Sequence, residues 1–423
     1  MKKTIMRILS YLLVSAIVCA ATLLISGNWQ LIRPENKLTE LEALLDKYYA
    51  DDLDRDTLYD AAADAMVEAL PDRWSYYISA EEYASYLENK NNAYVGIGVT
   101  VQQVADQIGL EVLKVTEGGG AAEAGIQAGD WIIEVDGVSL EGMTTEEITP
   151  LIKGEQGTQV TITVQRGEEK LPYPVTRKLI RSAVATGTML ENNIGLVRIE
   201  NFNNRCADET IAAVDTLLAQ GAQMLIFDVR NNGGGYTTEM VRVLDYLLPA
   251  GNVFRTVDYK GKETVETSDA ACVDVPMAVL VNGNSYSAAE FFAAALEEYD
   301  AAILVGEQTT GKGFYQITYQ LSDGSAVAIS SGRYYTPNGK NLEGIGLTPE
   351  YYVEVDNQTA MDIYNDLLEP MEDPQILAAI AALTQGEIKH RLSGMGRAVF
   401  FWKIRPGRVF ILVKTSKNPL TDW

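Results

Sequence analysis

The spacing of apolar residues predicts helices over residues 31–92. LTELEALLDKYYA and TLYDAAADAMVEAL repeat apolar residues every three or four positions, as an amphipathic helix does. Pro71 and Asp72 interrupt the pattern, and SAEEYASYLEN resumes it with Ser79 as the expected cap. This part is therefore expected to be helical.

The pattern changes to short alternating strands and glycine turns over residues 93–178. YVGIGVTVQQ, LEVLKVT, DWIIEVDGVSL and QVTITVQRG alternate apolar and polar residues, with one helix-like segment, TTEEITPLIKG, before the last. A small β-rich domain is predicted. In GIGV, Gly96 and Gly98 would let successive backbone N–H groups point into a cleft and hold a carboxylate. An ordinary hairpin turn is the alternative.

Apolar strands alternate with amphipathic helices over residues 179–384, as in IGLVRIENF, ADETIAAVDTLLAQG and AQMLIFDVR. This order predicts a mostly parallel sheet with helices packed on it, so the whole chain is expected to be mixed α/β (α+β). Ligand sites commonly form in the loops that follow such strands. Three of these loops carry candidate chemistry.

The first candidate loop is FDVRNNGGGY. Gly233, Gly234 and Gly235 lie between a strand and a helix, where backbone N–H groups can stabilise an oxyanion. The loop lacks the ending of a phosphate-binding P-loop. A plain flexible turn is the alternative.

The second candidate loop, NGNSYSAAE, places Ser285 and Ser287 before an alanine-rich helix. Such serines are usually caps. A strand-to-helix turn can also expose a nucleophile and leave the next N–H, here that of Ala288, free as a donor. The only histidine, His390, is far along the chain in the tail, which disfavours a Ser-His-Asp triad and points to lysine as the base.

The third candidate loop, GEQTTGKGFYQ, supplies such a lysine. Lys312 lies between Gly311 and Gly313, and Gln316 follows four residues later, where it could fix the amine by hydrogen bonding. A solvated surface charge is the alternative for a lysine in a glycine turn.

Composition narrows the function further. The formal net charge of −24 disfavours nucleic-acid binding, which depends on Lys and Arg. The three cysteines, Cys19, Cys206 and Cys272, form no metal-binding pattern, although Cys206 and Cys272 could pair outside the cytoplasm. We expect no metal and no cofactor.

The two ends of the chain differ from the rest. Lys2, Lys3 and Arg7 precede an uncharged stretch at 8–27, so residues 1–30 are predicted to form an uncleaved membrane anchor; a cleaved signal segment is the alternative. The basic residues place the catalytic region outside the cytoplasm, in the periplasm or at the cell exterior. Residues 385–423 form a basic, aromatic tail for which the sequence gives no physical account.

The motifs together resemble a known family. RNNGGG, NGNSYSAAE and GKGFYQ are similar in order and spacing to the motifs of carboxyl-terminal processing (tail-specific) proteases, which are Ser-Lys peptidases with a PDZ domain. The resemblance implies Ser287 as nucleophile, Lys312 as base 25 residues later, and Gln316 as its partner. Tyr286, Ala289 and Gly233 depart from the family's commoner residues, but none of these changes removes a catalytic group.

The resemblance extends to residues 93–178, where GIGV and GGGAAEAGIQAGDWIIEVDG resemble a PDZ domain. It implies that Gly96, Ile97 and Gly98 hold the C-terminal carboxylate of a peptide. The implied protein is a membrane-anchored serine endopeptidase that acts on protein substrates with exposed C-termini. Its oxyanion donors would be the N–H groups of Ala288 and of Gly233 or Gly234, and homo-oligomerisation is left open.

Two other classes of function are alternatives. The chain could be a catalytically inactive PDZ scaffold or chaperone of the cell envelope. It could also use its glycine-rich turns for thioester chemistry on coenzyme A, which the acidic composition argues against. Acylation of Ser287 by a serine-reactive probe would separate the peptidase from the scaffold.

Overall fold

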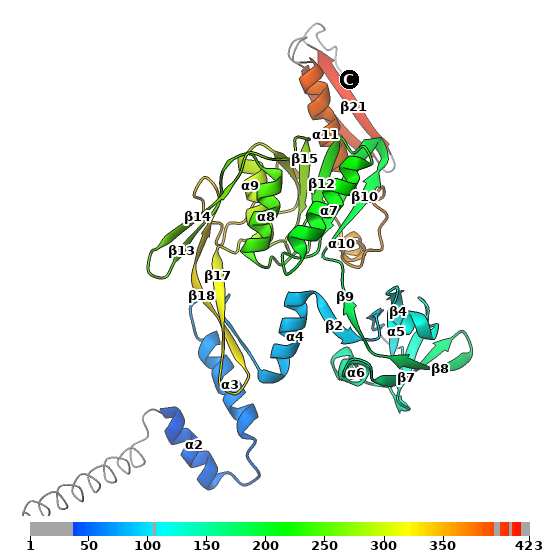
Figure 1. Ribbon diagram of the computed structural model, residues 1–423, viewed down its shortest axis with the longest axis vertical. Helices are drawn as coiled ribbons and strands as arrows, with labels where there is room; N and C mark the ends of the chain where they lie inside the picture. Colours follow the sequence, from blue (N-terminus) through cyan, green and yellow to red (C-terminus); the bar gives the residue numbers. More distant parts are fainter. Residues whose placement is uncertain (1–36, 105–106, 393–397, 406–407, 416–423) are drawn as a thin grey trace, which may run out of the picture. The chain divides into compact units, whose positions relative to one another are not determined.

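The computed structural model describes residues 37–104, 107–392, 398–405 and 408–415, and the chain divides after Leu70 into two compact units (Figure 1). The first unit contains helices α2 (Lys37–Tyr48) and α3 (Arg55–Glu68), neither of which buries a residue. Arg55 joins them through ion pairs to Glu42 at 2.7 Å and Asp46 at 2.6 Å. Both helices were predicted from the apolar spacing.

The second unit opens with strand β1 (Tyr76–Ile78) and helix α4 (Ala80–Asn91). Ser79 caps α4 in a capping box with Glu82, so the predicted cap is confirmed. The helix ends at Asn92, whose left-handed backbone (φ 48°) turns the chain into the next strand.

The β-rich domain follows α4. Six strands of this domain form one antiparallel sheet. The strand by which the chain enters the domain pairs separately with the strand by which it leaves. The sheet consists of β3 (Val99–Gln102), β4 (Leu110–Val115), β5 (Trp131–Val135), β6 (Val138–Ser139), β7 (Gln159–Arg166) and β8 (Glu169–Thr176). The entry pair is β2 (Ala93–Gly96) with β9 (Lys178–Arg181), and the helices are α5 (Gly120–Ala124) and α6 (Thr145–Ile152).

A six-stranded central sheet organises the next domain, in the order β10-β11-β12-β15-β16-β19. All neighbours are parallel except β10 with β11. The strands are β10 (Ala185–Leu190), β11 (Ile194–Ile199), β12 (Met224–Asp228), β15 (Met277–Val281), β16 (Ala302–Gly306) and β19 (Tyr351–Tyr352), with a 3-10 turn, η1 (Glu191–Asn193), after β10.

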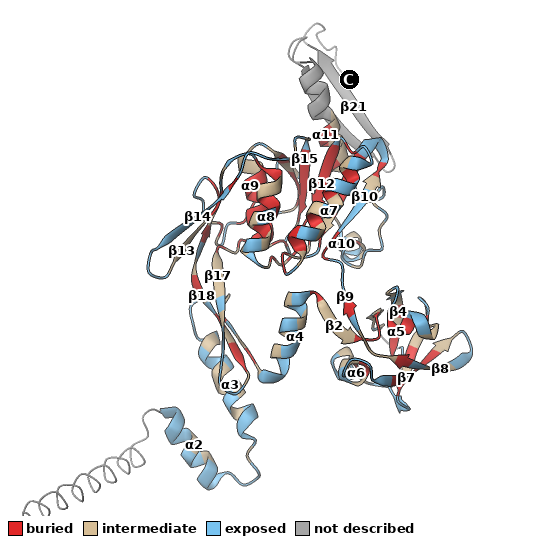
Figure 2. Cartoon of the chain, in the orientation of Figure 1, coloured by how far each residue is buried: buried red, intermediate tan, exposed pale blue. Residues whose placement is uncertain are grey.

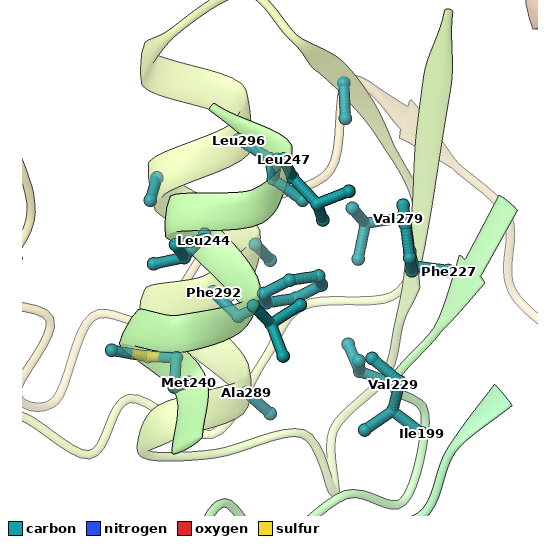
Figure 3. Packing of buried hydrophobic residues seen from close by; sticks show 14 of the residues in the cluster. Ile199, Phe227, Val229, Met240, Leu244, Leu247, Val279, Ala289, Phe292 and Leu296 are labelled. Carbon is teal, nitrogen blue, oxygen red and sulfur yellow. The ribbon is translucent and has the colours of Figure 1, made fainter. Parts of the chain in front are cut away.

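Helices cover both faces of the central sheet, which explains the unbroken apolar runs of its middle strands (Figure 2). Phe227 and Val229 face the core formed with helices α8 and α9, together with Val279 and Phe292 (Figure 3). Ile226, one residue from Phe227, faces the opposite cluster with helix α11. The helices are α7 (Cys206–Ala219), α8 (Thr237–Leu247), α9 (Ala288–Glu298) and α11 (Pro374–Leu392).

A second sheet in this domain is entirely antiparallel, which corrects the prediction of a mostly parallel sheet for the domain as a whole. Strand orientation in the domain is mixed. The reason is that β13 joins β14, and β17 joins β18, through turns too short for a parallel crossover. Its strands are β1, β13 (Gly251–Asp258), β14 (Glu263–Ser268), β17 (Phe314–Gln320) and β18 (Ala326–Tyr335).

The remaining described elements are helix α10 (Asn357–Tyr364) and, within the predicted tail, the paired strands β20 (Ala398–Arg405) and β21 (Arg408–Thr415). The predicted membrane anchor, residues 1–30, lies outside the described residues. None of the helices within the described ranges is long and apolar enough to cross a membrane. Cys206 is buried, Cys272 is exposed, and both are free thiols.

Candidate active site

Ser287 lies at the turn between β15 and α9, where its backbone adopts an unusual conformation. Its φ of 59° and ψ of −127° fall outside the regions that residues with a Cβ normally occupy. The residue is 5% exposed. Strain of this kind costs about 1–3 kcal/mol and persists only where the surroundings enforce it. The turn thus has the strained geometry expected of a strand-to-helix elbow.

Ser285, two residues earlier, shapes this turn. Its hydroxyl donates to the carbonyl oxygen of Val229 at 2.7 Å and accepts from the backbone N–H of Asn282 at 3.0 Å. It is fully buried. Ser285 therefore fastens the turn to the end of β12, and its hydroxyl is already engaged.

Glu290 connects the serine loop to the lysine loop. Its Oε2 accepts from the backbone N–H of Ser287 at 3.0 Å and of Lys312 at 2.8 Å. Its Oε1 accepts from the N–H of Gly311 at 2.7 Å and from the hydroxyl of Thr309 at 2.5 Å. Burial raises the pKa of this fully buried carboxyl, and the four donors oppose that rise. One carboxyl group thus fixes the backbones of both candidate catalytic residues.

Lys312 is half-buried and lies among aromatic rings. Its Nζ is 5.0 Å from the ring centroid of Trp74 and 5.7 Å from that of Tyr286, and the two rings stack at 6.3 Å. Burial lowers the pKa of Lys312 to about 8. At that pKa about one molecule in ten carries a neutral amine at pH 7, far more than for a solvated lysine. A neutral amine can accept a proton.

Gln316 lies at the third position of β17, and its amide nitrogen donates to the hydroxyl of Ser330 at 3.0 Å and to the carbonyl oxygen of Phe314 at 3.4 Å. The side chain is therefore held by β17 and β18 in this structure. Its predicted role of holding the amine of Lys312 stays a prediction.

The glycine loop packs directly against the serine turn. A Cβ on Gly234 would come within 2.9 Å of the backbone N of Ala288, and one on Gly233 within 2.6 Å of the hydroxyl of Tyr286. Gly234 also has φ +85°, which favours glycine. Its N–H donates to Oδ1 of Asn232 at 2.8 Å, so this donor is engaged. The structure thus brings Gly234 beside Ala288 and Gly233 beside Tyr286, and the predicted oxyanion role of these residues stays a prediction.

A cavity of about 590 Å³ lies beside the glycine loop. Tyr334 of β18 lines this cavity. Burial raises the pKa of Tyr334, and the nearby hydroxyl of Ser287 opposes that rise. Gly235 and Gln316 also line the cavity. Neither Ser287 nor Lys312 lines this cavity, so it offers space for a substrate side chain beside the glycine loop and Tyr334.

The predicted carboxylate-binding loop, Gly96 to Gly98, joins β2 to β3 and is buried. The carbonyl oxygen of Ile97 accepts from the N–H of Ala121 at 2.8 Å, and that of Gly98 from the N–H of Thr116 at 2.9 Å. Gly98 has φ +81°. These bonds hold the carbonyl oxygens of Ile97 and Gly98 within the domain, and the predicted binding of a carboxylate by this loop stays a prediction.

Sequence reasoning did not assign roles to Glu290, Glu343 and Trp74. The sequence does contain a signal for Glu290, because Ser287 and Glu290 have the spacing of a capping box. Trp74 donates from Nε1 to Glu343 at 2.9 Å, and Glu343 accepts from the N–H of Gly313 at 2.7 Å. No local pattern predicts this bridge, because Trp74 is distant in sequence from both partners.

Family models match two parts of the chain. The model described as Peptidase family S41 matches residues 193–353, which contain all three candidate loops. The model described as PDZ domain matches residues 111–166, a range that leaves out Gly96 to Gly98. Both matches are narrower than the predicted domains at 179–384 and 93–178, whose bounds stay predictions.

Curated relatives agree with these matches. The "Probable CtpA-like serine protease" of Staphylococcus aureus (strain COL) is 32% identical over 333 residues, which cover 78% of this chain and 66% of the relative. The protein of the same name in Staphylococcus epidermidis (strain ATCC 12228 / FDA PCI 1200) is 30% identical over 364 residues, covering 84% and 74%. The solved photosystem II D1 C-terminal processing protease is 28% identical, with a TM-score of 0.45, over 75% of this chain and 87% of its own.

The chain spans about two thirds of the length of the Staphylococcus aureus relatives that it matches. The resemblance predicted from RNNGGG, NGNSYSAAE and GKGFYQ is confirmed by the family match and by these relatives. The chain therefore belongs to peptidase family S41 and carries a PDZ domain ahead of its peptidase region.

Proposed function

We propose that this protein is a serine endopeptidase in which Ser287 is the nucleophile and Lys312 the general base. The observation that carries the proposal is the bridge made by Glu290, whose carboxylate binds the backbone N–H groups of both residues. A lysine with a pKa of about 8, fixed to the same carboxylate as a strained, buried serine, is suited to that chemistry.

The first step transfers the proton of the Ser287 hydroxyl to the neutral amine of Lys312 while the serine oxygen attacks the scissile carbonyl carbon. In this structure the Nζ of Lys312 lies beside the rings of Trp74 and of Tyr286, the residue that precedes the serine. The N–H of Ala288, with that of Gly233, would hold the oxyanion; one such donor is typically worth about 10²–10³ in rate.

The tetrahedral intermediate then collapses. The C–N bond breaks, and the leaving amine takes the proton from the Lys312 ammonium, which leaves an acyl group on Ser287. Water attacks this ester while Lys312 accepts its proton; the C–O bond to Ser287 then breaks, the serine oxygen takes the proton back from Lys312, and the new carboxyl end of the substrate is released. No step needs a metal or a cofactor.

The PDZ domain would select substrates by their C-termini. A peptide added beside β3 would place its carboxylate on the loop formed by Gly96, Ile97 and Gly98. The matches to a PDZ domain and to peptidase family S41 support peptide or protein substrates. A peptide with an amidated C-terminus should therefore bind more weakly than the same peptide with a free carboxylate.

We also propose that residues 8–27 anchor the protein in the cytoplasmic membrane with its catalytic region outside the cytoplasm, on the basis of their uncharged sequence after Lys2, Lys3 and Arg7. Fractionation of cells would test this. The proposal requires the full-length chain in the membrane fraction, accessible to protease added from outside.

Labelling with a fluorophosphonate probe tests the catalytic assignment. The intact protein should gain one adduct, mapped to Ser287, and Ser287→Ala should gain none. Lys312→Ala should label at least 100-fold more slowly, whereas Lys262→Ala, which removes an exposed lysine, should label like the wild type. Folded protein that acquires no adduct would instead support the inactive PDZ scaffold.

A further inference from the structure

Residues 72–75, the segment just before β1, bind the loop that carries Lys312. Trp74 donates from Nε1 to both carboxylate oxygens of Glu343, at 2.9 and 3.1 Å. Glu343 in turn accepts from the backbone N–H of Gly313 at 2.7 Å. The indole is therefore tied, through one carboxylate, to the residue that follows Lys312.

Arg73 binds the other side of the same loop. Its Nη2 donates to the carbonyl oxygen of Gly311 at 3.3 Å, and its Cζ lies 4.2 Å from the centroid of the Trp74 ring. Its Nε is 4.0 Å from the carboxylate of Glu343. The side chain is 58% exposed, so water screens much of its charge. Arg73 thus supports the ring of Trp74 and fixes the residue before Lys312.

The backbone of Trp74 is fixed by its neighbours in the segment. Oδ1 of Asp72 accepts from the N–H of Trp74 at 3.0 Å, and Oδ2 accepts from the hydroxyl of Ser75 at 2.5 Å. The hydroxyl oxygen of Ser75 accepts from the N–H of Ser330 on β18 at 3.0 Å. The segment is therefore fastened to the antiparallel sheet as well as to the lysine loop, and the ring has a defined place.

The amine of Lys312 lies beside the rings that this segment places. Its Nζ is 5.0 Å from the ring centroid of Trp74 and 5.7 Å from that of Tyr286. The two rings stack, with centroids 6.3 Å apart and planes 24° from parallel. Because Tyr286 directly precedes Ser287, one aromatic pair lies beside both the amine and the serine turn.

Aromatic rings act on a lysine amine in two opposite ways. Their faces attract an ammonium, which raises the pKa, whereas their exclusion of water disfavours the charge and lowers it. Burial is the main cause that lowers the pKa of Lys312 to about 8, so exclusion of water outweighs the attraction. Among the charges nearby, Asp72, Glu343 and Glu290 raise the pKa of Lys312 and Lys90 lowers it.

We infer that Trp74 is a positioning residue whose ring, tied to the lysine loop through Glu343 and stacked on Tyr286, holds the Lys312 amine beside the serine turn and shields it from water. The inference rests on the proposed function of Lys312 as the base. Trp74 takes no part in making or breaking bonds, and it acts only through the place of the amine.

Competitive acetylation tests this role without relying on catalysis. The full chain is treated with limiting acetic anhydride between pH 6 and 11, and mass spectrometry follows acetylation of Lys312. The profile gives the pKa of the amine and, above that pKa, its accessibility to the reagent. Trp74→Leu removes the ring, and Trp74→Phe keeps a ring but loses the Nε1 donor. Trp131→Leu, the same change at a half-buried tryptophan of β5, is the matched control.

In Trp74→Leu the pKa of Lys312 should rise by about half a unit or more toward its ordinary value, and acetylation above that pKa should become faster. Trp74→Phe and Trp131→Leu should keep the wild-type profile. If Trp74→Leu does not fold, Trp74→Met serves as the variant without a ring. An unchanged profile of Lys312 in the folded variant would overturn the inference.

Arg73→Met separates the ring of Trp74 from the charge beside it. This change should alter the Lys312 profile less than Trp74→Leu does, because the guanidinium is largely exposed. An equal rise of the Lys312 pKa in both variants would assign the effect to the charge of Arg73. An equal effect of Trp74→Phe and Trp74→Leu would assign it to the bond with Glu343. Either result would overturn the role of the ring.

Fluorophosphonate labelling of the same samples separates this inference from the proposed function. A raised pKa of Lys312 in Trp74→Leu, with slower labelling of Ser287 at neutral pH that Trp74→Phe restores, supports both. A raised pKa in a protein whose wild type never labels would keep the positioning role of Trp74 and remove the peptidase. A wild type that labels at Ser287, with Trp74→Leu labelling at the same rate and pH midpoint, would overturn this inference alone.

Discussion

At the scale of single residues, the candidate site depends on one buried carboxylate. Glu290 satisfies four donors from two loops, and those loops carry Ser287 and Lys312. The identities of Ser287 and Lys312 could be predicted because residue type and spacing carry that information. The bridge that Glu290 forms between the two loops could not be predicted, because a Ser-x-x-Glu spacing also describes an ordinary helix cap.

Glu290→Gln should impair both stability and catalysis. A glutamine keeps one acceptor oxygen and replaces the other with an NH₂ group, which cannot accept a hydrogen bond. The backbone N–H groups that donate to the replaced oxygen therefore lose their partner. We expect a loss of about 1.5–3 kcal/mol in the free energy of unfolding. Labelling of Ser287 in the folded fraction should slow at least 100-fold; urea denaturation and probe kinetics measure the two effects. Labelling at the wild-type rate would exclude the bridge as a catalytic support.

Lys312 should also affect stability in a pH-dependent way. Its pKa of about 8 in the folded protein is below the ordinary value of 10.5, so the unfolded chain binds a proton between these values that the folded protein does not. The contribution of Lys312 to the free energy of unfolding is therefore fully present above pH 10.5 and is lost as the pH falls through 8. Lys312→Met should be stabilised relative to the wild type at pH 6, and the difference in melting temperature should shrink toward pH 10. A constant difference would contradict the lowered pKa.

At the scale of elements, each candidate loop follows a strand of the central sheet. β12 leads to the glycine loop, β15 to the serine turn and β16 to the lysine loop, and the three strands are neighbours. The alternation of strands and helices predicted this sheet. It missed the antiparallel sheet, because hairpins such as β17–β18 depend on which strands pair, whereas local alternation reports only that strands exist.

Ser285→Ala tests how the serine turn is fixed to β12. The change leaves the carbonyl of Val229 without this donor and the N–H of Asn282 without this acceptor, in a buried site. We expect the free energy of unfolding to fall by about 1–3 kcal/mol. The folded fraction should still label at Ser287, because Ser285 carries no catalytic step. Complete loss of labelling in a folded Ser285→Ala protein would reassign the nucleophile.

At the scale of the whole peptidase region, a buried ion cluster joins the central sheet to its last core helix. Arg230, after β12, pairs with Asp228 at 2.7 Å and with Asp373, just before α11, at 2.7 Å. All three side chains are less than 10% exposed. The sequence shows these charges but cannot show that residues so far apart meet, so the cluster was not predicted.

Arg230→Met should destabilise the folded protein strongly. It leaves two buried carboxylates without their cation, which typically costs about 3–5 kcal/mol. Arg198→Met, which removes a more exposed arginine paired with Glu200 and Asp366, is the matched control and should cost far less. Chemical denaturation of both variants measures the difference. Equal effects would show that burial of the cluster adds nothing.

The pH dependence of Ser287 acylation tests the central claim most directly. If neutral Lys312 is the base, the second-order rate of fluorophosphonate labelling should rise about tenfold per pH unit below a midpoint near 8 and level off above it. Lys312→Arg should stay unlabelled across the range, because a guanidinium does not lose its proton. A wild-type rate that is flat from pH 6 to 9, or a Lys312→Arg protein that labels as fast as the wild type, would contradict the Ser-Lys account.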